Sequence, residues 1–269
     1  MLCKIASRGT FLLVAAQFGM THAAESSVSQ HKPSGTHYNG TYISLALNPV
    51  YLSYSELQLY DVRSGGLITP AIQSFDPSVL GFGASLGHSL VALEIPARFE
   101  AEYIYLPKVN ANFNPLYNAS PDADFPLPDS VDQARMNSTI SSSTLLVNGL
   151  YDFVNESRYI PYFMAGLGFT YTSTNSRVTN TVGVINPAFS PTYYSQGNTN
   201  IAWNVGAGMR VIANKRLFID VLYRFMRLGS VDWGGALTYP NSSSGFNSFN
   251  LRAYQAYGSM LSFKATWQE

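Results

Sequence analysis

The sequence has few charged residues and no long hydrophobic run after its first segment. Charged residues make up 12% of the 269 positions, about half the usual globular share, and the formal net charge is zero. A balanced charge gives no electrostatic reason to expect nucleic-acid binding. No stretch beyond the N-terminal segment approaches the ~18 apolar residues that a membrane-spanning helix needs. If the chain enters a membrane, we expect it to do so as strands.

Cysteine is nearly absent. The single cysteine, Cys3, lies in a segment with basic residues, an apolar run and then small residues before Glu25, which is the pattern of a secretory signal. Cleavage there would leave a mature chain with no thiol, disulfide or cysteine metal ligand. We therefore expect three regions: a signal peptide over 1–24, a periplasmic segment over 25–38 and a folded domain over 39–269.

Aromatic residues are abundant, at 14% of the chain, and many of them recur at every second position. In SRYIPYFMAGLGFTYTST, over 157–174, the odd positions from Tyr159 onwards are apolar or aromatic, while glycines and hydroxyl residues stand between them. Alternation with a period of two is typical of a strand with two different faces. Eight segments show it: 41–48, 79–87, 97–105, 145–153, 157–174, 200–211, 216–225 and 256–267.

The connections between these segments alternate in length. Three are short, over 88–94, 155–158 and 213–216. Unstructured links above about 15 residues are unusual in a compact soluble domain, whereas short turns on one rim and long loops on the other are typical of outer-membrane barrels. The pattern predicts an all-β fold, an eight-stranded antiparallel up-and-down transmembrane β-barrel with short periplasmic turns. Its four long extracellular loops are expected at 50–77, 108–137, 174–198 and 229–251.

The charged residues of the strands fall on the face opposite the aromatic residues. A soluble barrel would place its charges outward, so this arrangement favours a lipid-facing exterior and a polar lumen. Four of the charges are acidic and four basic, as expected if the ions are paired away from bulk water. The predicted lumen residues are Arg98, Glu100, Glu102, Asp152, Arg210, Asp220, Arg224 and Lys264.

Aromatic residues on the apolar face are candidates for the membrane interface. Tyr159 and Tyr171 are twelve residues apart, which corresponds to about 30 Å along the membrane normal for a strand tilted by ~40°. That spacing suits two aromatic girdles around an apolar band of about 25 Å. The stretch 226–233 is expected to add aromatic residues to an exposed loop. The predicted interface residues are Tyr159, Tyr171, Trp203, Tyr223 and Trp267.

The segments YIPYFMAGLGFTY, AWNVGAGMRV and LFIDVLYRFMRLG, together with IPARFEAEYIY, carry a family resemblance. They resemble the small outer-membrane β-barrel proteins of Gram-negative bacteria, the family of opacity-type adhesins, surface antigens and the transmembrane domain of outer-membrane protein A. The resemblance implies export to the outer membrane and contact with its lipid and lipopolysaccharide. It also implies a non-enzymatic role, without a cofactor, as an envelope or adhesive surface protein whose loops contact host or other cell-surface macromolecules.

Two other functions stay open. The lumen charges favour a paired polar core, and the alternative is the ion path of a small porin or channel. A lipid-modifying enzyme is the less favoured possibility, since none of the four histidines falls in a predicted long loop. Four aspartates in one of these loops suggest a solvated acidic segment, or alternatively a divalent cation site with oxygen ligands. These aspartates are Asp122, Asp124, Asp129 and Asp132.

Overall fold

The fold is described by a computed structural model. It covers residues 40–61, 67–68, 74–113, 134–155, 157–180, 192–237 and 247–268. The predicted signal peptide, the predicted periplasmic segment and the four loop aspartates all lie outside these described residues. They remain predictions from sequence.

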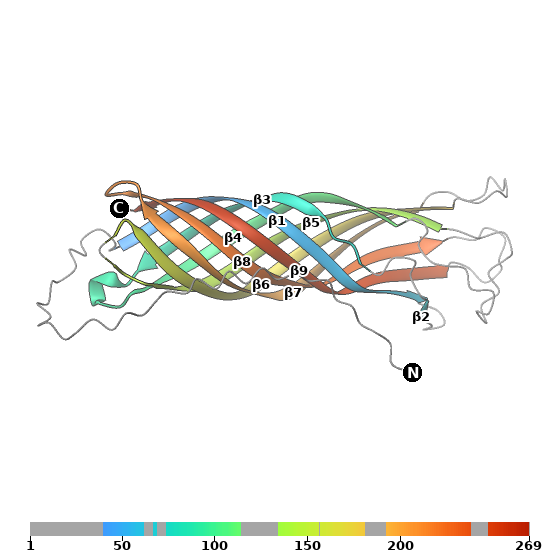
Figure 1. The fold of residues 1–269 in the computed structure, drawn as a ribbon. Helices are drawn as coiled ribbons and strands as arrows, with labels where there is room; N and C mark the ends of the chain where they lie inside the picture. Colours follow the sequence, from blue (N-terminus) through green and yellow to red (C-terminus); the bar gives the residue numbers. More distant parts are fainter. Residues whose placement is uncertain are drawn as a thin grey trace, which may run out of the picture. The chain divides into compact units, whose positions relative to one another are not determined.

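Eight long strands form a closed antiparallel barrel (Figure 1). Each long strand pairs with the next long strand in sequence, and β1 also pairs with β9, which closes the ring. A two-residue strand, β2 (Leu67–Ile68), adds to β1 beyond the end of β3. The long strands are β1 (Gly40–Asp61), β3 (Ser78–Ser89), β4 (Ala97–Phe113), β5 (Ala134–Asp152), β6 (Tyr159–Asn180), β7 (Thr192–Ile212), β8 (Leu217–Leu237) and β9 (Asn247–Gln268).

The short connections lie together at one end of the barrel. They join β3 to β4 through a turn of 3₁₀ helix (Val91–Leu93), β5 to β6, and β7 to β8, at the end where β1 starts and β9 stops. The other end carries the connections that follow β1, β4, β6 and β8. The predicted eight-stranded up-and-down barrel is therefore confirmed, and its short-turn end is the periplasmic one. No helix among the described residues is long and apolar enough to span a bilayer.

The strands extend well beyond the predicted boundaries at the extracellular end. The predicted loops 50–77, 108–137, 174–198 and 229–251 are wrong at their edges, because β1 continues to Asp61, β6 to Asn180 and β8 to Leu237. In β6 both faces become polar past Tyr171, where Thr172 and Thr174 point inward and Asn175 outward. Polarity on both faces removes the alternating signal, so sequence alone reads this part of the strand as a loop.

Bulges in the same region reverse which residues face inward. In β8 even-numbered residues are buried up to Leu228, and odd-numbered ones from Gly229 onwards, because a bulge at Gly229, with φ of 93°, shifts the register. A bulge after Leu106 does the same in β4. The expectation that 226–233 forms an exposed loop is wrong, since this segment is strand and Trp233 is fully buried.

The outer face of the barrel carries a continuous apolar band. Leu45, Leu167 and Ile201 expose 71%, 65% and 68% of their surface, and large apolar side chains are exposed on each of the eight long strands. A surface of this kind on a closed barrel is stable against lipid and unfavourable against water. The barrel is therefore built to span a membrane.

Tyrosine hydroxyl groups mark the extracellular edge of this band. The Tyr103 hydroxyl lies 3.1 Å from the Ser143 hydroxyl, and the Tyr257 hydroxyl donates to Gln255 Oε1 at 2.8 Å. The ring of Tyr171 leans over Gly197 on β7. Each ring thus keeps its apolar body on the band and sends its hydroxyl toward the extracellular end, as an aromatic side chain does at a membrane interface.

A charge placed on the outer face tests this membrane placement. Leu167→Arg is expected to lower the free energy of unfolding by about 2–4 kcal/mol, because Leu167 lies near the middle of the apolar band. Ser173→Arg, on the same strand and face but beyond Tyr171, is the control and should change it by less than about 1 kcal/mol. The measurement is urea unfolding in lipid vesicles. Equal losses in the two variants would contradict the placement.

Candidate functional site

The periplasmic half of the barrel interior holds a cluster of charged side chains. They come from β4, β5, β7, β8 and β9, and each is 5% exposed or less. Strand alternation alone places them there, because each stands between two lipid-facing neighbours. The cluster, called here the luminal ion network, consists of Arg98, Glu100, Glu102, Asp152, Arg210, Asp220, Arg224 and Lys264.

Two arginines of this network pair with aspartates on the adjacent strand. Arg98 on β4 donates two hydrogen bonds to Asp152 on β5, at 2.8 and 2.7 Å. Arg210 on β7 donates two to Asp220 on β8, both at 2.9 Å. Such two-pronged contacts between guanidinium and carboxylate combine charge with fixed geometry, so both arginines are held rigidly.

The other pairs cross the barrel. Arg224 on β8 donates to Glu102 on β4 at 2.5 and 3.0 Å, and these strands are four apart in a ring of eight. Lys264 on β9 donates to Glu100 and also lies 3.3 Å from Glu102. Because the pair between Arg224 and Glu102 spans the full diameter and Lys264 reaches a carboxylate three strands away, the network closes the interior at this level.

Aromatic rings fill the space around the arginines. The guanidinium carbon of Arg98 lies 4.9 Å from the ring centre of Tyr162, and that of Arg210 lies 5.0 Å from the ring centre of Phe218. Both distances are in the range of cation–π attraction. Gly208 leaves the room that Tyr162 needs, since a Cβ atom there would lie 2.6 Å from the Tyr162 ring.

Two asparagines extend the network in a way that the sequence analysis missed. Asn148 donates to Glu102 Oε2 at 2.8 Å, and Asn204 donates to Asn148 Oδ1 at 3.0 Å. The alternating pattern already placed both asparagines on the inner face. The predicted network was chosen by charge, so these neutral side chains were not included. Asn148 thus shares Glu102 Oε2 with Arg224, and Asn204 holds the Asn148 side chain in place.

The extracellular half of the interior holds a large apolar cluster beside buried hydroxyl residues of β5 and β6. Leu52, Ile104, Leu146 and Met226 are nearly inaccessible and belong to one large cluster of buried side chains. Near the extracellular end of this cluster four aromatic rings are in contact, with ring centres 5.6–6.1 Å apart. One pair is stacked and three pairs meet edge to face. The four, called here the aromatic cap, are Tyr54, Phe75, Phe113 and Trp233.

The candidate interface aromatics lie on the outer face, at different positions along the apolar band. Tyr159 and Trp267 lie at the periplasmic end of their strands and expose 55% and 57% of their surface. Tyr171 lies at the extracellular edge, and Trp203 pairs with Leu167 inside the band. Tyr223 pairs with Ala207 and Leu261, which places it inside the band rather than at an edge.

Comparisons with known proteins agree with this architecture. No protein-family model matches the chain. It is 28% identical over 158 residues to outer membrane protein PagN of Salmonella typhimurium, a match that covers 57% of this chain and 59% of PagN. The chain thus matches less than two thirds of that curated relative's length.

Among solved structures, the chain is similar to OprG of Pseudomonas aeruginosa, with a TM-score of 0.49 and 15% identity over 87% of this chain and 99% of OprG. It is also similar to Neisserial surface protein A, with a TM-score of 0.41 and 15% identity over 86% of this chain and 97% of that one. The closed barrel, its apolar outer band and the similarity to PagN together define the class: the chain is a small eight-stranded outer-membrane β-barrel.

The contribution of the diametric ion pair can be measured with paired substitutions. Glu102→Gln should lower the free energy of unfolding by about 3–5 kcal/mol, because it leaves the buried Arg224 without its carboxylate. Adding Arg224→Met should recover much of the loss, because Lys264 keeps Glu100 as its partner. Urea unfolding in vesicles gives the free energy of unfolding of Glu102→Gln, of Arg224→Met and of the double variant. Losses that simply add in the double variant would contradict the pairing.

Proposed function

We propose that this protein is a non-enzymatic, non-conducting outer-membrane surface protein that contacts host or other cell-surface macromolecules through its extracellular end. The observation that carries the proposal is the filled interior. The luminal ion network spans the diameter of the periplasmic half, and apolar side chains with the aromatic cap occupy the extracellular half. The interior of an eight-stranded barrel is only wide enough for such side chains, so we assign the function to the outer surface of the barrel.

The extracellular end offers the surface for this role. On β6 the strand continues nine residues past Tyr171, which raises its tip about 20 Å above the extracellular edge of the apolar band. The exposed positions at this end of the wall include Asn175 and Arg177 on β6 and Tyr193 on β7. Tyrosine beside asparagine, serine and glycine is a composition that suits adaptable contacts with macromolecules.

Adhesion is tested with segment replacements. We expect cells that express the full chain to bind host cells or matrix proteins. Replacing 114–133, 181–191 or 238–246 by a short Gly-Asn turn should reduce binding for at least one segment. The matched control replaces the periplasmic turn 213–216. Folding of each variant is checked by the different migration of boiled and unboiled samples in SDS gels. Absence of binding by cells that express the full chain would refute the adhesive role, and unchanged binding in all three variants would contradict a role for these segments.

Conductance is tested with the purified barrel in planar bilayers. The expected result is no opening above background, because the ion pairs would have to separate before ions could pass. A salt-dependent conductance that Glu100→Gln alters would instead establish the channel function. Lipid A and phospholipid profiles should stay unchanged on overexpression, and a new modified lipid would establish an enzymatic one.

A further inference from the structure

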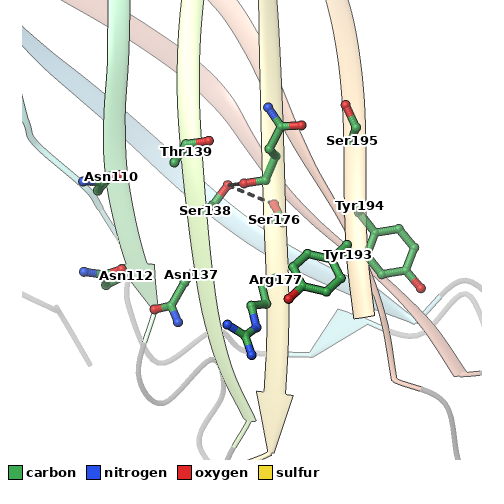
Figure 2. Close-up of a pocket in the computed structure, with 11 residues that line it drawn as sticks. Asn110, Asn112, Asn137, Ser138, Thr139, Ser176, Arg177, Tyr193, Tyr194 and Ser195 are labelled. Atoms are coloured by element: carbon green, nitrogen blue, oxygen red, sulfur yellow. Dashed lines mark hydrogen bonds between the residues drawn. The ribbon is translucent and has the colours of Figure 1, made fainter. Parts of the chain in front are cut away.

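A polar groove lies on the barrel wall above the apolar band. It has a volume of about 450 Å³ and crosses the extracellular parts of β4, β5, β6 and β7 (Figure 2). Asn112, Asn137, Arg177 and Tyr193 pair in register from strand to strand and form one row of its floor. A second row, one step closer to the membrane, consists of Asn110, Thr139, Asn175 and Ser195.

Among the described residues, the charges in and beside the groove are positive. The described parts of these four strands beyond the apolar band are 107–113, 134–143, 172–180 and 192–200, and they contain no aspartate or glutamate. They do contain Arg177, which lines the groove, and the exposed Lys108 beside it. The opposite wall differs, since Asp232 and Arg252 neutralise each other there.

Arg177 and Tyr193 are presented to solvent as a pair. The guanidinium carbon lies 5.5 Å from the ring centre, and Tyr193 exposes 68% of its surface. Stacking on the ring orients the guanidinium, while its N–H groups stay available. A planar guanidinium is suited to two-pronged recognition of phosphate or carboxylate, and an exposed ring is suited to the apolar face of a sugar.

The height of the groove identifies where its ligand comes from. Asn175 and Arg177 lie four and six residues past Tyr171 on β6, which corresponds to about 10 and 15 Å above the extracellular edge of the apolar band. Asn137, Asn175 and Arg177 of the groove are exposed on the outer face of the barrel wall. A lipid of the same leaflet therefore reaches it with its headgroup sugars.

We propose that this groove binds the anionic inner-core saccharide of lipopolysaccharide. Arg177 holds a phosphate or carboxylate of the saccharide, Tyr193 lies against a sugar ring, and the amides of Asn137 and Asn175 bond its hydroxyl groups. The regular spacing of about 4.8 Å between strands gives a row of donors and acceptors that a chain of sugars can follow. This inference does not depend on the adhesive role proposed above.

The test uses the full-length protein, refolded free of lipopolysaccharide in detergent. Binding is measured for three probes: rough lipopolysaccharide with a phosphorylated inner core, lipid A alone and a soluble heparin octasaccharide. Arg177→Gln should weaken binding of the rough lipopolysaccharide about tenfold and leave lipid A binding unchanged. Arg227→Gln is the matched control, since Arg227 is an exposed arginine on β8 outside the groove, and it should change binding by less than twofold.

Two results would overturn the proposal. Equal losses for Arg177→Gln and Arg227→Gln would mean that the attraction is a general charge effect. Binding of the heparin octasaccharide in preference to lipopolysaccharide would mean that the groove serves a soluble or host glycan. Migration of boiled and unboiled samples confirms that both variants fold. A failure here leaves the adhesion and conductance experiments unaffected, because their variants do not alter the groove.

Discussion

The fold depends on placing eight charges inside a barrel that is barely wide enough to hold them. A single buried charge without a partner destabilises a protein by several kcal/mol, so every carboxylate of the luminal ion network requires a cation at a fixed position. The pair between Glu102 and Arg224 makes this requirement global, because it connects strands on opposite sides of the ring. Arg98 and Arg210 already pair with aspartates on adjacent strands, and closure of the barrel completes the neutralisation of the interior.

The same constraint fixes the strand register. A slip of one residue in a strand would move its inward charges to the lipid face and its leucines into the lumen. For β4 such a slip would put Arg98, Glu100 and Glu102 against lipid at once. Buried ion pairs add little net stability compared with apolar side chains of the same size, and their clearest contribution here is to exclude wrong registers.

The strands could be predicted from the sequence where the outer face meets only lipid and the inner face meets only the packed interior. Between Tyr159 and Tyr171 one face meets lipid and the other a packed interior, so the period of two was unbroken and the strand count followed from it. It also placed residues such as Arg98 and Asp220 on the inner face. It did not assign the pairs, because Glu102 and Arg224 are 122 positions apart and become neighbours only through closure of the ring.

The strand extensions of the extracellular half could not be predicted from the sequence, for two physical reasons. Water replaces lipid there, so polar residues such as Asn175 serve on the outer face and the contrast between faces is lost. Bulges then reverse which residues face inward. Tyr223 and Phe225 face outward, so continuing their alternation along β8 would wrongly place Trp233 on the outer face. The groove that includes Asn137, Arg177 and Tyr193 was hidden for the same reasons.

The division of the interior follows from the same change of solvent along the barrel axis. In the periplasmic half every strand faces lipid on its outside. Polar residues on the inside then differ from the apolar residues outside, and this difference determines which face of each strand points inward. Beyond Tyr171 the exterior is wet. Apolar residues such as Leu59, Phe113 and Trp233 then supply the contrast from inside on β1, β4 and β8, as in a soluble barrel. Hydroxyl residues such as Ser138, Thr174 and Ser176 instead line the inside of β5 and β6. The chain thus joins a membrane barrel to a water-exposed one, with bulges near the boundary between them. Paired strands can hold a rigid array of side chains above the lipid, which a flexible loop cannot do, and this is the physical basis for locating recognition on the strands as well as on the connections between them.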